Sequence, residues 1–195
     1  MKKYIFILVT AMLSACGTPE KQETTVTELP SEWIANATIY EVNVRQYTQE
    51  GSLVAFEERL PKLKELGVDV LWFMPIQPIG KRNRKAVGDT FVQDLADPDY
   101  TKYWGSPYSI ADYTAVHPRY GSVQDFKRII AKCHEMDMKV ILDWVGNHTA
   151  WDNPWVTNNP EWYTHDSTGK ITDPIGDDGK SWGWTDVADL NYNNK

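Results

Sequence analysis

The chain has 195 residues, and its hydrophobic content of 42% is enough to build a core for one or two domains. Its formal net charge of -7 at pH 7 argues against a nucleic-acid or polybasic membrane surface, because binding phosphates requires a positive footprint. We therefore expect no nucleic acid among its partners. The 9 tryptophans and 10 tyrosines supply more aromatic surface than such a core normally needs, and aromatic rings suit flat apolar faces.

The first 16 residues have the features of an export signal. Two lysines precede the apolar run YIFILVTAML, which is too short to span a membrane as a mature helix. The run ends in LSAC, which resembles the bacterial lipobox and implies that Cys16 is lipidated and becomes the new first residue. Gly17 rather than Asp follows it, which resembles the pattern of outer-membrane lipoproteins. The alternative is an ordinary signal peptide with a chance cysteine.

We therefore predict a lipoprotein signal peptide over residues 1–16 and a flexible polar tether over residues 17–31. The predicted location is outside the cytoplasm, with a lipid anchor in the outer membrane of a bacterium. Only Cys133 remains after the signal, and a single thiol forms no intramolecular disulfide.

Strand and helix patterns alternate from Thr38 onward. The segment TIYEVNV (38–44) is the first strand candidate, and VDVLWFM (68–74) is the second. Between them, a helix with Gly67 as its C-terminal stop carries apolar residues at helical spacing, and Pro61 must lie at a helix start or a kink. The apolar positions of this helix are Phe56, Leu60, Leu63 and Leu66.

A second helix begins at Ser122, which forms a predicted capping box with Asp125. Its apolar stripe predicts that Cys133 is a buried packing residue without a redox role. The stripe consists of Phe126, Ile129, Ile130, Cys133 and Met136. The segment MKVILDWV (138–145) follows as the third strand, and this order predicts a parallel α/β sheet with crossover helices.

Two connections, roughly 75–121 and 149–195, are too long for simple turns, and both follow strands. Ligands of parallel α/β sheets bind beyond the carboxyl ends of the strands, so both connections are predicted to lie at a site. The third strand ends at Asp143. The apolar run before it favours a strand covered on both faces, where a carboxylate requires a partner.

Several separate blocks of this sequence are similar to the α-amylase family of glycoside hydrolases. They are, in family order, IYEVNVRQ, LKELGVDVLWFMPI, GSPYSIADYTAVHPRYGSVQDF, DWVGNH and DVADLNY, and the similarity covers roughly residues 33–195. The resemblance implies a (β/α)8 TIM barrel with a loop-rich subdomain inserted after the third strand. Residues 32–148 would then form the first three β/α units, and residues 149–195 would begin the inserted domain.

The resemblance also implies roles for single residues. Asp143 would hold the arginine of the site and orient the sugar, and His148 would bond a hydroxyl of the glucose next to the cleaved linkage. Tyr108 would stack on the same ring, although a core tyrosine with a satisfied hydroxyl is the alternative. The implied substrate is an α-glucan or maltooligosaccharide. Asn147 and Asp189 match positions of a structural calcium in many family members, whereas Asn147 could instead cap a turn.

Retaining glycoside hydrolysis requires two carboxylates about 5–5.5 Å apart. In the family these follow later strands, and no GFRxD-like stretch occurs among the 195 residues. We therefore expect the N-terminal part of a larger hydrolase or transglycosidase, inactive alone, with an open sheet edge and an uncovered core.

Two other classes of protein are alternatives. One is a non-catalytic glycan-binding surface lipoprotein, which would keep the aromatic platform without the chemistry. The other is a metal-dependent hydrolase that uses Asp143, His148 and His165. Catalytic zinc needs three ligands and an open position, and the spacing offers no HExxH or comparable pair.

Overall fold

The structure is a computed structural model that describes residues 31–194. The predicted signal peptide, its Cys16 and nearly all of the predicted tether lie outside the described residues. A short helix, α1 (Ser31–Ala35), is separate from the compact unit that begins at Asn36. Among the residues described, no helix has the length and apolar character needed to cross a membrane.

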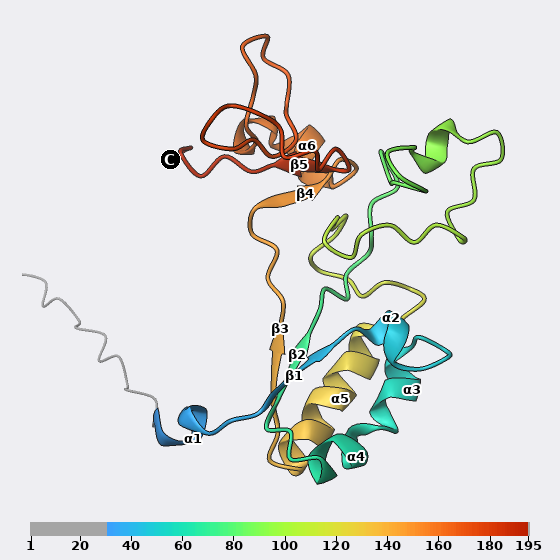
Figure 1. Cartoon of the computed structure of the whole chain (residues 1–195), viewed down its shortest axis with the longest axis vertical. Coiled ribbons are helices and arrows are strands. Elements are labelled where there is room, and N and C mark those ends of the chain that lie inside the picture. Colours follow the sequence, from blue (N-terminus) through green and yellow to red (C-terminus); the bar gives the residue numbers. More distant parts are fainter. Residues whose placement is uncertain (1–30, 195) are drawn as a thin grey trace, which may run out of the picture. The chain divides into compact units, whose positions relative to one another are not determined.

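A parallel sheet of three strands forms the centre of this unit, in the order β1-β2-β3 (Figure 1). The strands are β1 (Ile39–Val42), β2 (Val70–Phe73) and β3 (Lys139–Leu142). They confirm the predicted α/β class with parallel pairing. Each is shorter than its predicted segment, and after β1 the chain turns into the short helix α2 (Val44–Tyr47).

The first predicted helix is divided into α3 (Leu53–Glu57) and α4 (Leu60–Glu65). Pro61 lies in the first turn of α4, where its missing N–H costs no helical hydrogen bond, as predicted. Gly67 adopts a φ of +81° just beyond α4, which confirms it as the helix stop. Leu66 is 67% exposed and does not belong to the buried stripe.

Helix α5 (Val123–Glu135) begins with the predicted capping box. The Ser122 side chain accepts from the Asp125 N–H (3.2 Å), and the Asp125 carboxylate accepts from the Ser122 N–H (2.7 Å). Ile129 and Cys133 are fully buried, which confirms a packing role for Cys133. Burial raises the pKa of its thiol to about 11, so the thiol stays protonated at neutral pH.

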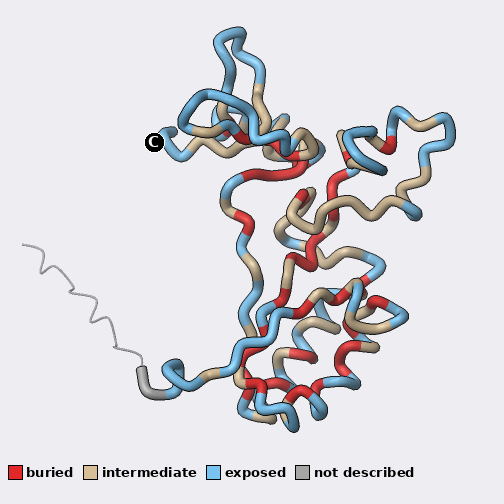
Figure 2. The backbone as a smooth tube through the Cα atoms, in the orientation of Figure 1, coloured by how far each residue is buried: buried red, intermediate tan, exposed pale blue. Residues whose placement is uncertain are grey.

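Helices α3, α4 and α5 supply one apolar core against one face of the sheet (Figure 2). The strand residues in this core alternate with residues of the opposite face, where Ile39, Trp72 and Ile141 are 57%, 38% and 46% exposed. The prediction that β3 is covered on both faces is therefore wrong for the described residues. Helices α3, α4 and α5 pack on the other face, and this exposure agrees with the uncovered core expected of three barrel strands.

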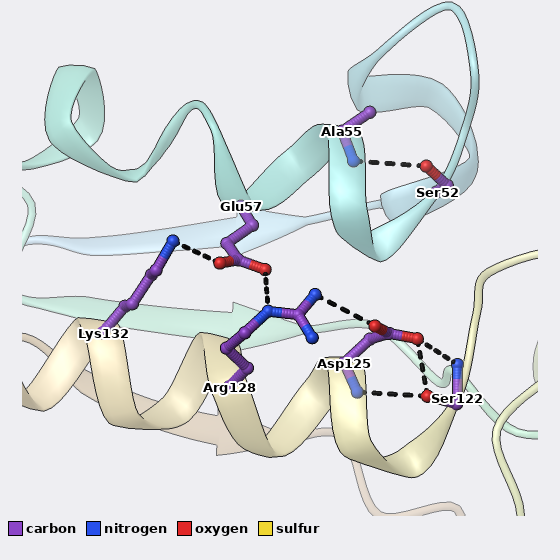
Figure 3. Close-up of polar contacts among 7 residues, drawn as sticks. All are labelled: Ser52, Ala55, Glu57, Ser122, Asp125, Arg128 and Lys132. Atoms are coloured by element: carbon purple, nitrogen blue, oxygen red, sulfur yellow. Dashed lines mark hydrogen bonds and ion pairs between the residues drawn. The ribbon is translucent and has the colours of Figure 1, made fainter.

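A charged network joins α3 to α5 beside this core (Figure 3). The buried Glu57 carboxylate accepts from Arg128 (2.7 Å) and pairs with Lys132, while Arg128 also donates to Asp125 (2.9 Å). Burial raises the pKa of the Glu57 carboxyl, but the hydrogen bonds from Lys132 and Arg128 outweigh it, so the pKa lies below its ordinary value.

Both long connections follow carboxyl ends of strands, as predicted. Residues 75–121 contain a short 3-10 helix, η1 (Val92–Asp94), and isolated bridges. The segment after β3 contains an antiparallel pair, β4 (His148–Ala150) with β5 (Val187–Asp189). Two further short helices are α6 (Pro154–Asn158) and η2 (Pro160–Trp162). The predicted boundary at residues 148 and 149 falls within β4 and stays a prediction.

Candidate functional site

The backbone places Asp143 directly after β3, at the carboxyl edge of the sheet. Its N–H donates to the Phe73 carbonyl (2.8 Å), which extends the pairing with β2 by one residue. Its carboxylate accepts a hydrogen bond from the Tyr108 hydroxyl (3.3 Å) across 35 residues of sequence. The partner that the sequence required for this carboxylate is therefore Tyr108.

Tyr108 lies in the first long connection and is half-buried. Burial raises the pKa of its phenol, and the negative charge and hydrogen bond of Asp143 raise it further. The hydroxyl therefore keeps its proton and remains a donor. The ring also lines a cavity, so Tyr108 is not only a core residue with a satisfied hydroxyl.

His148 begins β4 and is only 6% exposed. Its Nδ1 lies 3.1 Å from the Asn147 side-chain amide nitrogen, and its ring has a hydrogen bond with the Tyr108 backbone. Burial lowers the pKa of the imidazole, although the Tyr108 bond and the carboxylates of Asp186 and Asp189 oppose this shift. The ring is therefore neutral at pH 7, with one N–H donor.

Tyr108 and His148 are brought together in one cavity of about 310 Å³. Its lining consists of Ser106, Tyr108, His148, Trp184, Asp186 and Val187. Asp143 is not part of the lining, but its carboxylate accepts the hydrogen bond from the Tyr108 hydroxyl and so positions the Tyr108 ring. A slightly larger cavity of about 340 Å³, next to Trp162 and Tyr192, contains none of the predicted site residues. The smaller cavity is therefore the candidate site.

Trp184 and Asp186 were not predicted as site residues. Their signal was the cluster SWGWTDV, which overlaps the block DVADLNY. The sequence does not show that Trp184 and Asp186 lie near His148, because the two segments are far apart in the chain. The pairing of β5 with β4 brings residues 187–189 next to residues 148–150. In that pairing, His148 lies opposite Asp189.

The loop that carries Asp143 and His148 is held by Tyr113. The Tyr113 hydroxyl donates to the Val145 carbonyl (2.7 Å) and shares this hydrogen with the His148 carbonyl (3.0 Å). Its ring stacks on Trp155, with centroids 5.2 Å apart and planes 11° apart. Tyr113 therefore positions the loop without lining the cavity, a role that the sequence did not reveal.

The predicted calcium residues are neighbours in the folded chain. The Leu190 N–H donates to the Asn147 carbonyl (3.0 Å), which places Asn147 beside the residue that follows Asp189. Calcium takes about 6–8 oxygen ligands. Within residues 31–194, no group of three or more His, Cys, Asp or Glu side chains could hold a metal ion. The two residues do not form a complete site by themselves, and calcium stays a prediction.

The absence of a metal-binding group among residues 31–194 also bears on the alternative of a metal-dependent hydrolase. Among the residues described, Asp143, His148 and His165 do not form a metal-binding group. His165 instead lies in an isolated bridge with Ile171, with its Nδ1 2.9 Å from the Tyr163 carbonyl. This arrangement does not support that class of enzyme.

An aromatic and imidazole-lined cavity beyond the carboxyl ends of parallel strands is typical of enzymes built on barrels of this type. Comparison with protein-family models matches residues 22–174 to the catalytic domain of α-amylases. The chain therefore belongs to the α-amylase family.

Individual relatives agree with this assignment. The chain is 35% identical over 140 residues to the alpha-1,4-glucan:maltose-1-phosphate maltosyltransferase of Rhodospirillum rubrum, covering 68% of this chain and 19% of that protein. It is 32% identical over 165 residues to alpha-amylase 3 of Dictyoglomus thermophilum, covering 82% of this chain and 26% of that protein. The chain thus spans only about a fifth to a quarter of these relatives.

Solved structures show the same fold. An alpha-amylase from Lactobacillus plantarum superposes with a TM-score of 0.66 at 41% identity, over 81% of this chain and 32% of that one. A noncanonic maltogenic alpha-amylase from Thermotoga neapolitana superposes with a TM-score of 0.65 at 33% identity. The superposition covers 82% of this chain and 33% of that one. These findings confirm the predicted fold class, the N-terminal part of a (β/α)8 barrel with an inserted loop-rich segment after the third strand.

Proposed function

We propose that this chain forms the sugar-positioning part of an enzyme that hydrolyses or transfers α-glucosidic bonds with retention. The observation that carries the proposal is that Tyr108 and His148 line one cavity beyond the strand ends, where the Tyr108 hydroxyl donates to Asp143. The printed names of relatives, an α-1,4-glucan maltosyltransferase and an α-amylase, support an α-glucan or maltooligosaccharide as the substrate.

Each residue has a separate part in holding the sugar. The Tyr108 ring offers its face to a pyranose, and its bond to Asp143 fixes the orientation of that ring. The neutral His148 can donate a hydrogen bond to a sugar hydroxyl from a buried position. Such a bond accelerates the reaction only if it strengthens in the transition state.

Positioning alone does not cleave the linkage. Retention requires a carboxylate nucleophile and a carboxylic acid about 5–5.5 Å apart. We propose that both lie beyond residue 195, in a longer protein that contains these residues. In that protein, Asp143 would also hold the arginine of the site, as the family resemblance implies.

Kinetics of the longer protein test the role of His148. We expect His148→Ala to lower kcat more than it raises KM, because the lost bond belongs mainly to the transition state. His134→Ala, an exposed change on α5, is the control and should alter neither constant. An unchanged kcat in His148→Ala would contradict the role.

A second assay concerns the 195-residue chain itself. We expect it to release no reducing sugar from maltooligosaccharides. Release that Asp143→Ala abolishes would show that the catalytic carboxylates lie within this chain. If the longer protein binds glucans but cleaves none, the glycan-binding lipoprotein becomes the better description.

Anchoring is a separate part of the proposal. The basic start, the apolar run and LSAC at Cys16 support export, acylation of Cys16 and attachment to the outer membrane. One acyl chain attaches a protein weakly, so stable anchoring requires more than one chain. Mass spectrometry of the mature N-terminus tests this, and removal of Cys16 or an unmodified Cys16 would contradict it.

A further inference from the structure

A pair of tryptophans extends the aromatic surface of the candidate site. The rings of Trp182 and Trp184 lie 4.8 Å apart at 70°, and these residues are 51% and 45% exposed. Trp184 lines the cavity and meets the His148 ring edge to face at 5.7 Å. The aromatic surface therefore continues from His148 over Trp184 to Trp182, outside the cavity.

The segment that carries both rings is held in place although its side chains are exposed. Hydrogen bonds from distant parts of the chain reach its backbone on both sides of Trp184. They are Lys85 Nζ to the Gly183 carbonyl (3.0 Å), Trp151 Nε1 to the Thr185 carbonyl (3.0 Å) and Ser109 Oγ to the Asp186 carbonyl (3.0 Å). Within the same loop, the Trp182 N–H donates to the Pro174 carbonyl (3.0 Å). Rings that are already ordered lose little conformational entropy when a ligand binds.

Two glycines allow this arrangement. Gly183, between the two tryptophans, has a φ of +79°, which other residues adopt only with strain. At Gly176, an added Cβ would lie 2.8 Å from the indole nitrogen of Trp182. The position of the Trp182 ring therefore depends on the absence of a side chain at residue 176.

We infer that Trp182 and Trp184 form a second sugar-binding position, which takes the glucose unit next to the one held by Tyr108 and His148. The inference rests on the proposed function. A pyranose ring is flat and partly apolar on its C–H faces, so it packs on an aromatic ring, and the two nearly perpendicular indoles offer a face and an edge. The same cavity carries Ser106 and Asp186, whose oxygens can bond sugar hydroxyls.

The continuity of the surface favours a saccharide over a protein partner. The centre of a surface that binds another protein is an apolar patch with few charged groups. These two rings instead adjoin a cavity lined by an imidazole, a hydroxyl and a carboxylate, which are groups that bind sugar hydroxyls. The ligand expected from this arrangement is an α-glucan of at least two units. Glucose alone would occupy only the position at Tyr108 and His148.

Calorimetry with glucose, maltose and maltotriose on the full chain, purified in detergent, tests the inference. We expect the affinity of the wild-type chain to rise with ligand length. Trp182→Ala should weaken maltotriose binding about tenfold and leave glucose binding unchanged, because only the longer ligand reaches this ring. Trp182→Tyr keeps an aromatic face and should retain most of the affinity.

Gly176→Ala and Trp162→Ala complete the set. Gly176→Ala keeps both indoles but displaces Trp182, so it should also weaken maltotriose binding. Trp162 is 41% exposed and lines the other cavity, so Trp162→Ala is the matched control and should have no effect. If Trp182→Ala does not fold, as judged by circular dichroism, the Tyr and Gly176 variants decide the question.

The outcomes separate the two proposals. If the wild-type chain binds none of the three sugars, the proposed function fails and the inference fails with it. If binding is normal and its dependence on length survives Trp182→Ala and Gly176→Ala, only the inference is overturned. Loss of affinity in Trp162→Ala alone would move the second position to the other cavity and overturn the assignment to Trp182 and Trp184.

Discussion

The layer of strands and helices contains the main apolar core, whereas the segments beyond the strand ends bury fewer apolar side chains, such as Ile110 and Tyr163, and depend more on long-range hydrogen bonds. The layer is an apolar core in which Leu53, Phe56 and Phe73 are fully buried. The segments beyond it are held by hydrogen bonds over long sequence distances, such as the bond from the Lys81 N–H to Asp152 (2.8 Å, 71 residues apart). Apolar burial is non-directional, so it does not require exact positions of the packed atoms. Hydrogen bonds are directional and fix donor and acceptor atoms relative to one another.

This difference matches the separate roles of the two regions, since the second region forms the candidate site and the first region supports it. A site must hold its groups within narrow geometric limits, which the polar bonds of the second region provide. The layer below needs only to present the ends of the strands. Substitutions in the first region should therefore change stability most, and those in the second should change both stability and ligand binding.

The largest effect should come from the core. Phe73 packs edge to face with Phe56 (5.3 Å) and Phe126 (5.2 Å), so Phe73→Ala should lower the free energy of unfolding by about 3–5 kcal/mol. The neighbouring Trp72 points to the uncovered face, and Trp72→Ala should cost at most about 2 kcal/mol. Chemical denaturation measures both. Equal losses would show that the two faces of the sheet are covered alike.

The next effect concerns the loop of the site. Tyr113→Phe removes the hydroxyl that bonds the Val145 and His148 carbonyls, and should lower the free energy of unfolding by about 2 kcal/mol. Because the loop carries Asp143, maltooligosaccharide affinity should fall as well. Calorimetry and denaturation on the same variant check this. A loss of stability with unchanged affinity would mean that Tyr113 only packs.

A smaller effect is expected from the network between α3 and α5. Glu57→Gln removes the charge that pairs with Arg128 and Lys132, but both cations are nearly half exposed, so solvent screens much of the loss. We expect a decrease of about 1 kcal/mol in the free energy of unfolding and no change in sugar binding. The adjacent exposed Glu58→Gln is the control, and an equal effect there would discount the network.

The smallest effect should appear as a dependence on pH. Burial lowers the pKa of His148 and of His117, with nearby arginines as a further cause at His117. Below the ordinary value of about 6.5, the unfolded chain therefore binds more protons than the folded one, and stability falls as pH falls. The slope per histidine is at most about 1.4 kcal/mol per pH unit.

Substitution separates the two histidines. His148→Gln and His117→Gln should each flatten the decline in stability below about pH 6.5, whereas His134→Gln on the exposed surface of α5 should not. Unfolding curves at a series of pH values measure this. If His134→Gln flattened the decline as much as His148→Gln, burial of the imidazole would not be its cause.

Much of the layer could be predicted because its signals are local. The capping box at Ser122, the stop at Gly67 and the buried Cys133 each depend on residues within a few positions of one another. The site was predictable only in part. Tyr108, Asp143 and His148 entered through resemblance to a family, and the structure brings Tyr108 to both others.

The sequence by itself determined the order of the first three strands and the helices that connect them, their parallel pairing and the family, because hydrophobic periods and motifs are formed by neighbouring residues. Only the tertiary structure decided which sheet face is covered and which residues join His148 at the cavity. Trp184 and Asp186 reach that cavity because β5 pairs with β4, two strands of three residues that are too short to show a period. Contacts between such distant segments depend on directional bonds that no local pattern encodes.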